Sequence, residues 1–126
     1  MYSLRTIAKA AGVSTDTLKV WVARGQVPWV PAYERSPGKP GRQLSRQDAE
    51  IVAVFAVVAN EWGPRWARDV VEAQISHGRK MPDKFTVYRD KGGIIYGSNH
   101  PTHGIYFSAT FYVDHIRERL TEEAKP

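Results

Sequence analysis

The sequence contains no cysteine. This absence excludes disulfide bonds, thiolate metal sites and cysteine nucleophiles. The chain also has no apolar run long enough to cross a bilayer, and its first residues lack the charged and then apolar profile of a secretion signal. We therefore expect a cytoplasmic protein that has no contact with a membrane.

Catalytic motifs are also missing. The sequence contains no G-x-S-x-G, no phosphate-binding glycine loop and no metal-protease motif. His100 and His103 form a short H-P-T-H sequence, and neutral imidazoles can bind zinc, but no cysteine or fixed acidic partner accompanies them. We expect no enzyme, no cofactor and no metal. An enzyme that acts through His100, His103 or His115 is the distant alternative.

Negative charge is scarce in the first third of the chain. The full 126 residues carry a net charge of +5. Residues 1–46 contain eight basic and two acidic side chains, whereas residues 47–126 contain ten basic and eleven acidic ones. All of the excess positive charge therefore lies in the first third, where it could neutralise a polyanion. A basic face that meets only solvent is the alternative interpretation.

Two short helices are predicted near the N-terminus. Apolar residues recur at helical spacing after Ser3 and stop at Gly12. A second helix is predicted to begin after the capping residue Ser14 and to end at Gly25, because glycine is favoured just beyond a helix C-terminus. Two helices joined by so short a turn are typical of a helix-turn-helix.

A proline-rich segment follows these helices. Residues 26–44 contain four prolines and two glycines, which excludes a helix there. We predict an extended hairpin whose tip carries Arg35, Lys39 and Arg42. A basic hairpin beside a helix-turn-helix is a wing.

The next segment is predicted to be helical. Ser45 is expected to cap a nearly all-apolar helix that runs to Trp62 and forms the centre of the core. Pro64 suits the first turn of a further helix over residues 65–76, in which Trp66 is expected to face inward.

The last third is predicted to be a hairpin followed by a helix. Residues 85–89 and 93–97 are rich in β-forming residues, and residues 104–107 are a candidate third strand. An amphipathic helix is expected after Ser108, with Tyr112 facing inward. The β-branched and aromatic first half of that run leaves open that it begins as a strand.

Residues of the two N-terminal helices and of the segment after the prolines match one family pattern: Ile7, Ala11, Gly12, Val13, Ser14, Thr17, Leu18, Gly25, Arg42, Ser45 and Asp48. With these residues, the first part of the chain resembles the N-terminal DNA-binding domain of MerR-type regulators, in which a wing follows a helix-turn-helix. Phage excisionases and terminase small subunits have similar domains. Asp16 departs from the family pattern, which often has a basic residue there, and the long dimerising helix of typical members is missing. The resemblance implies a protein associated with the nucleoid.

A helix-turn-helix inserts the start of its second helix into the major groove, and a wing contacts the flanking minor groove or phosphates. Asp16 has two candidate roles: it can stabilise the helix N-terminus, or it can accept a hydrogen bond from a cytosine amine. The candidate DNA-binding residues are Arg5, Ser14, Thr15, Asp16, Thr17, Lys19, Arg24, Arg35, Lys39 and Arg42.

We therefore predict a mainly α fold with a small β part. A winged helix-turn-helix over residues 1–78 is expected to precede a small α+β module over residues 79–126. The expected function is sequence-specific binding of double-stranded DNA by a bacterial or phage transcriptional regulator. A homodimer is expected because two half-sites multiply specificity, and the C-terminal module would mediate it or bind another protein. The alternatives are an excisionase-like architectural factor and a protein-interaction adaptor.

Overall fold

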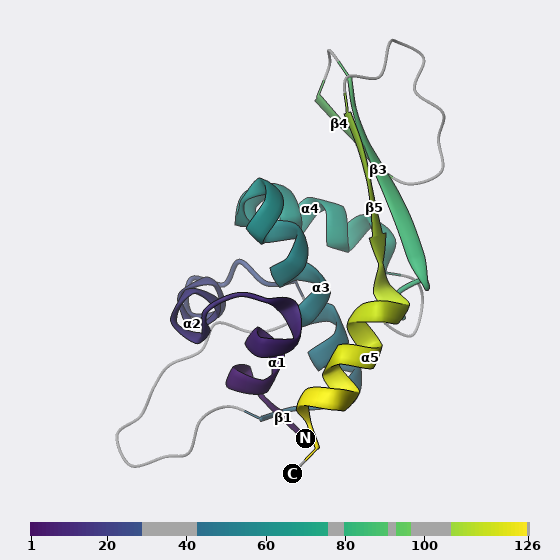
Figure 1. The fold of residues 1–126 in the computed structure, drawn as a ribbon. Helices are drawn as coiled ribbons and strands as arrows, with labels where there is room; N and C mark the ends of the chain where they lie inside the picture. Colours follow the sequence, from purple (N-terminus) through teal and green to yellow (C-terminus); the bar gives the residue numbers. More distant parts are fainter. Residues whose placement is uncertain (29–42, 76–79, 91–92, 97–106, 126) are drawn as a thin grey trace.

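The computed structural model describes residues 1–28, 43–75, 80–90, 93–96 and 107–125, and this part of the chain is mainly helical with a small β part, as predicted (Figure 1). The helices are α1 (Leu4–Ala11), α2 (Thr15–Ala23), α3 (Arg46–Trp62), α4 (Pro64–Gln74) and α5 (Val113–Glu123). The strands are β1 (Tyr2–Ser3), β2 (Gln43–Leu44), β3 (Lys84–Asp90), β4 (Gly93–Tyr96) and β5 (Phe107–Tyr112).

Three serines set the starts of three helices. Ser3, Ser14 and Ser45 each accept a hydrogen bond from the backbone N–H three residues further on, at 3.1 to 3.2 Å. Each bond satisfies one of the N–H groups that have no partner inside the helix. The predicted starts of α1, α2 and α3 are therefore confirmed.

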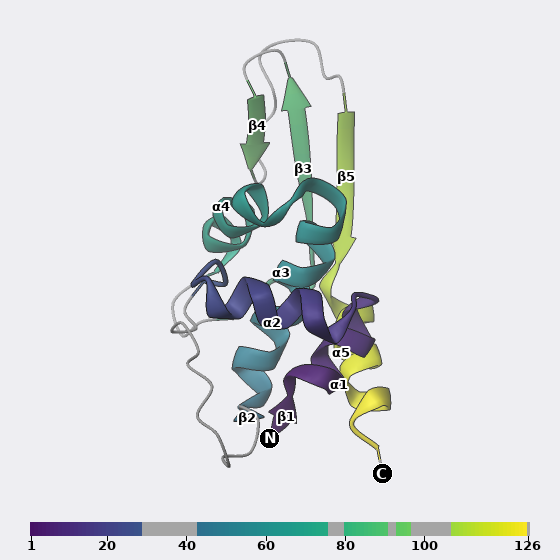
Figure 2. The ribbon, with the colours of Figure 1, turned by 90° about the vertical axis from the view of Figure 1, so that its left-hand side faces the viewer.

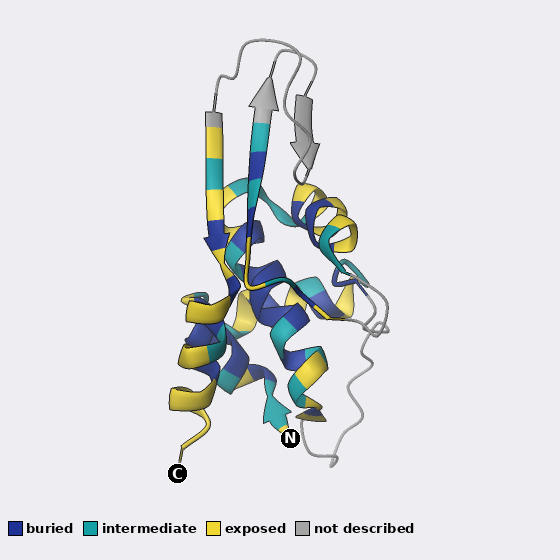
Figure 3. Cartoon of the chain, turned by 90° about the vertical axis from the view of Figure 1, so that its right-hand side faces the viewer, coloured by how far each residue is buried: buried dark blue, intermediate teal, exposed yellow. Residues whose placement is uncertain are grey.

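Helix α3 forms the centre of the core. Its side chains from Ile51 to Ala56 are all buried, and α1, α4 and α5 pack around it (Figure 3). Gly63 ends α3 with φ of +89°, and Pro64 begins α4 as predicted. The composition of α3 follows from this position, because a helix covered on several sides needs apolar residues all round.

Helix α4 presents a different face to the core from the one predicted. Ala67, Val70 and Val71 are buried, whereas Trp66 is 44% exposed. The expectation that Trp66 faces inward is therefore wrong. The side of α4 that carries Ala67, Val70 and Val71 is the buried one and α4 packs on α3, so Trp66 lies on the outer side of the helix.

Strand β3 lies between β4 and β5 in an antiparallel sheet. Phe85 pairs with Phe111 across β3 and β5, and both side chains are buried against the helices. The Phe111 ring also meets the Trp62 ring edge to face, with centroids 5.7 Å apart. Figure 2 shows that β4 and the adjoining end of β3 project beyond the helices.

The chain changes from strand to helix at Tyr112. Strand β5 ends there and α5 begins at Val113. The expectation of a helix directly after Ser108 is therefore wrong for residues 109–112, and the strand that the sequence left open as the alternative is found there. Tyr112 was expected to face inward, but it is 49% exposed. It alternates with the buried Phe111 on the last positions of β5 and so lies on the outer face of the sheet. Residues 104–106 of the candidate third strand lie outside the described residues.

Helix α5 returns to the N-terminal helices and packs against α1 and α3. Its buried side chains Val113, Ile116 and Leu120 belong to the same apolar cluster as those of α1. The boundary at residue 78 stays a prediction, and the buried cluster contains residues from both sides of it. Among the described residues, none of the helices has the length and apolar composition needed to cross a membrane.

Candidate nucleic-acid interface

Helices α1 and α2 are joined by a tight turn at Gly12. This residue has φ of +75°, a conformation that side chains disfavour, and its N–H donates to the carbonyl of Lys9 at 3.2 Å. Leu18 and Val22 then anchor α2 with side chains that are fully buried. The opposite side of α2 therefore faces outward, and Figure 2 shows the helix lying across α3.

The predicted hydroxyl groups at the start of α2 do not play equivalent roles. The Ser14 hydroxyl accepts from the N–H of Thr17 at 3.1 Å and donates to the Thr17 hydroxyl oxygen at 2.7 Å. Ser14 is thereby occupied by the cap, whereas the hydrogen of the exposed Thr17 hydroxyl can still be donated to a ligand. Thr15 is half-buried.

Asp16 lies in the first turn of α2 and is exposed. Ser14 supplies the side-chain cap of this helix, and within the described residues no hydrogen bond of the Asp16 carboxylate is present. The carboxylate therefore acts on the helix through its charge, which is favourable beside the positive end of the helix dipole. Both predicted roles of Asp16 are compatible with this placement.

Three predicted cations, Arg5, Lys19 and Arg24, are exposed on the two helices, and so is Lys9. Arg5 and Lys9 lie four residues apart on one side of α1, and Lys19 and Arg24 lie on α2 and at its C-terminal end. None of the four forms an ion pair with an acid in the described part of the chain. Their charges are therefore not neutralised by the protein there.

The end of α2 is held by a contact that the sequence did not predict. Arg68 of α4 donates from Nη1 to the carbonyl oxygen of Gly25 at 3.1 Å, and its Nε lies 3.4 Å from a Glu72 carboxylate oxygen. This bond satisfies a carbonyl just past the helix end. The partners are more than forty positions apart in the chain, so no local pattern could indicate the contact.

Val20 is a further candidate contact that was not predicted from the sequence. This apolar side chain is 44% exposed on the outer side of α2, next to Lys19. Helical spacing predicts this exposure. Leu18 and Val22 are buried on one face of α2, and Val20, two positions from each, therefore lies on the opposite face. An exposed methyl group on such a helix can contact the methyl group of thymine. Trp21, by contrast, packs edge to face on Phe55, with ring centroids 5.7 Å apart.

An ion network ties the start of the chain to α3 and α5. Arg46 donates to the Tyr2 hydroxyl and to the Arg117 carbonyl, both at 2.9 Å, and its Nε lies 3.1 Å from Glu50 Oε1. Burial alone would lower the pKa of Arg46, but the hydrogen bonds that Arg46 donates to Tyr2 and Glu50, together with the charges of these partners, outweigh burial and raise that pKa. The contacts of Arg46 therefore stabilise the fold, and we do not assign this residue to the candidate interface.

The predicted wing residues Arg35, Lys39 and Arg42 lie outside the described residues, and so do His100 and His103. A comparison with protein-family models and a search of curated proteins find no match for this chain. The similarity to MerR-type regulators therefore stays a prediction from the sequence.

Proposed function

We propose that the protein binds double-stranded DNA through α1 and α2, with α2 in the major groove. The observation that carries the proposal is that four exposed cations gather on α1 and α2 and form no ion pair with the described residues: Arg5, Lys9, Lys19 and Arg24. Cations that lack a protein partner can neutralise phosphates and release counterions. Regulation of transcription in a bacterium or phage is the role we propose for this binding.

The outer side of α2 combines charge with an apolar contact. Lys19 and Val20 each lie three or four positions from both Asp16 and Ala23, so the four side chains lie on one side of the helix, and all four are exposed. Lysine can donate to guanine, aspartate can accept from cytosine, and valine can contact thymine. This face can therefore distinguish bases as well as bind the backbone. The wing would add phosphate or minor-groove contacts through Arg35, Lys39 and Arg42.

The test is a salt titration of binding to labelled duplex DNA, followed by fluorescence anisotropy. We expect the dissociation constant to rise steeply with salt, because each neutralised phosphate contributes about 0.9 to the slope of log affinity against log salt. Lys19→Ala is expected to reduce this slope by about one. No binding at low salt would contradict the proposal.

Lys84→Ala is the matched control. Lys84 is an exposed lysine at the start of β3, and Figure 1 shows β3 on the other side of α3 from α2. This variant removes the same charge from the chain and is expected to leave the slope unchanged. An equal loss in both variants would show that net charge, and not α2, determines binding.

A further inference from the structure

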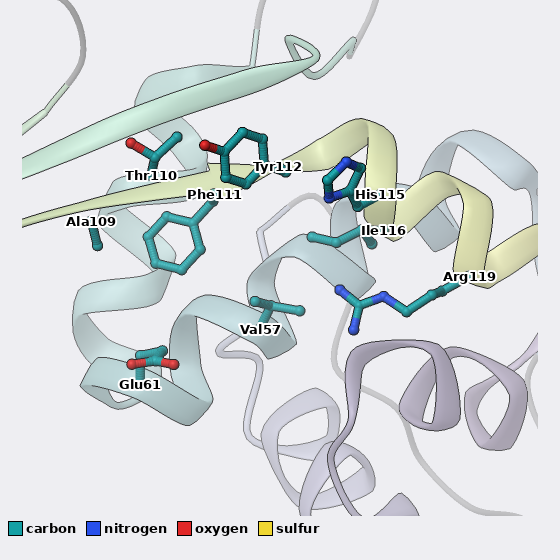
Figure 4. Close-up of a pocket in the computed structure, with 9 residues that line it drawn as sticks. All are labelled: Val57, Glu61, Ala109, Thr110, Phe111, Tyr112, His115, Ile116 and Arg119. Atoms are coloured by element: carbon teal, nitrogen blue, oxygen red, sulfur yellow. The ribbon is translucent and has the colours of Figure 1, made fainter.

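A groove lies beside β5, at its junction with α5. It has a volume of about 300 Å³ (Figure 4). Four consecutive residues of β5, from Ala109 to Tyr112, line it together with side chains of α3 and α5. Successive side chains of a strand point to opposite faces of the sheet, so only an edge can present four in a row. The groove therefore follows an edge of β5.

This edge has no neighbouring strand in the described part of the chain. Strand β3 pairs with the other edge of β5, and β5 is the last strand on one side of the three-stranded sheet. Half of the backbone N–H and C=O groups of a strand point toward each edge, and unpaired groups form a template for another strand.

The sequence of β5 does nothing to block such pairing. Its six residues, FSATFY, include no charge and no proline, and natural proteins protect exposed edges with these two devices. Tyr112 at the end of the strand is exposed and stacks on His115, with ring centroids 5.1 Å apart. The edge and this flat aromatic pair together form a surface suited to a strand partner.

Two opposite charges mark the ends of the groove. Glu61 on α3 and Arg119 on α5 both line it and both are exposed (Figure 4). Neither side chain forms an ion pair within the residues that the structure describes. A two-fold axis through the middle of the groove exchanges its ends. The axis therefore places Glu61 of each copy beside Arg119 of the other copy, so that two ion pairs form.

We propose that this groove is the interface with a second copy of the chain. The two β5 strands pair antiparallel about a two-fold axis, which joins the sheets of both copies, and two Glu61–Arg119 ion pairs fix the register. Such an interface is isologous, because the same surface serves both partners. The proposal concerns assembly alone, and it holds or fails independently of DNA binding.

Charge reversal tests the proposal by sedimentation equilibrium without DNA. We expect the wild-type chain to dimerise. Glu61→Arg or Arg119→Glu alone places two like charges opposite each other at both ends of the interface. Each single variant is therefore expected to weaken dimerisation about tenfold or more. The double variant restores opposite charges and is expected to recover the wild-type dissociation constant. Glu118→Arg, on the same helix but outside the groove lining, is the control that leaves it unchanged.

A crosslinking experiment tests the geometry. Because the chain contains no cysteine, each introduced thiol is unique. A mixture of Glu61→Cys and Arg119→Cys proteins is expected to form disulfide-linked dimers on oxidation, since the heterodimer brings the two thiols together and keeps one native ion pair. Either protein alone is expected to crosslink much less.

Three results would overturn the proposal. The first is a wild-type chain that stays monomeric at hundreds of micromolar, and the second is dimerisation that resists both single reversals. The third is a cysteine mixture that crosslinks no better than its components. Circular dichroism of every variant verifies that a lost dimer does not reflect a lost fold.

Discussion

Arg46 and Arg117 share one carboxylate. Arg46 Nε lies 3.1 Å from one oxygen of Glu50, and Arg117 Nε lies 3.3 Å from the other. Arg117 also contacts Asp83 at 2.6 Å and donates to the Met81 carbonyl at 2.7 Å. Through Glu50 and Arg117, α3, α5 and the segment before β3 are held in one arrangement.

Removal of the shared charge is expected to destabilise the fold. Glu50→Gln leaves two partly buried guanidinium groups close together without the carboxylate that they share, while Arg117 keeps its pair with Asp83, and we expect a loss of about 2 kcal/mol in the free energy of unfolding. Urea denaturation measures it. Glu72→Gln is the control, because its pair with Arg68 is about half exposed and such pairs contribute less than about 1 kcal/mol. Equal losses in the two variants would contradict this reasoning.

Loss of packing in α5 is expected to weaken the N-terminal helices. Leu120 is fully buried, and Leu120→Ala should cost about 2 to 5 kcal/mol. Since α5 packs on α1, hydrogen exchange in α1 is expected to accelerate as much as in α5 itself. Glu118→Ala, an exposed change on the same helix, should leave both rates unchanged. Unchanged protection of α1 in Leu120→Ala would show instead that the two segments unfold independently.

Neutralisation of Asp16 is expected to affect stability and DNA binding in opposite directions. Asp16→Asn removes a favourable charge from the start of α2, so the melting temperature should fall slightly. It also removes a negative charge from the proposed DNA-binding face, so affinity for mixed-sequence DNA should rise by up to about fivefold at low salt. High salt should abolish this gain. Anisotropy titrations at two salt concentrations measure this change in affinity. If Asp16→Asn instead weakens binding only to sites with one particular base pair, the result would support the base-reading role of Asp16.

Short-range patterns predicted the helix starts well. A serine followed by a run of helical periodicity locates a cap within a few residues, and at Ser3, Ser14 and Ser45 the local hydrogen bond forms as expected. Gly12 likewise ends α1 because its backbone adopts a positive φ, which glycine tolerates. These features depend on residues three or four positions apart, so one sequence is sufficient to identify them.

Orientation and long-range contacts were less predictable. Trp66 and Tyr112 are large and apolar, which favours burial, yet the approach of α4 to α3 and the alternation of β5 leave both exposed. The Arg68 bond to Gly25 and the pairing of Arg117 with Glu50 join distant segments. For the site, the sequence predicted the exposed cations of α1 and α2 but not the side of α2 on which Val20 lies.

The packing of α5 on α1 has a consequence for synthesis of the protein. The ribosome makes α1 and α2 early and α5 after all the other described helices, so the part of α1 that packs on α5 lacks this partner until translation has passed residue 120. Apolar surface exposed in this way makes a nascent chain prone to misassembly. The proposed DNA-binding helices would therefore mature only on chains translated through α5, and prematurely terminated chains would be poor competitors for DNA.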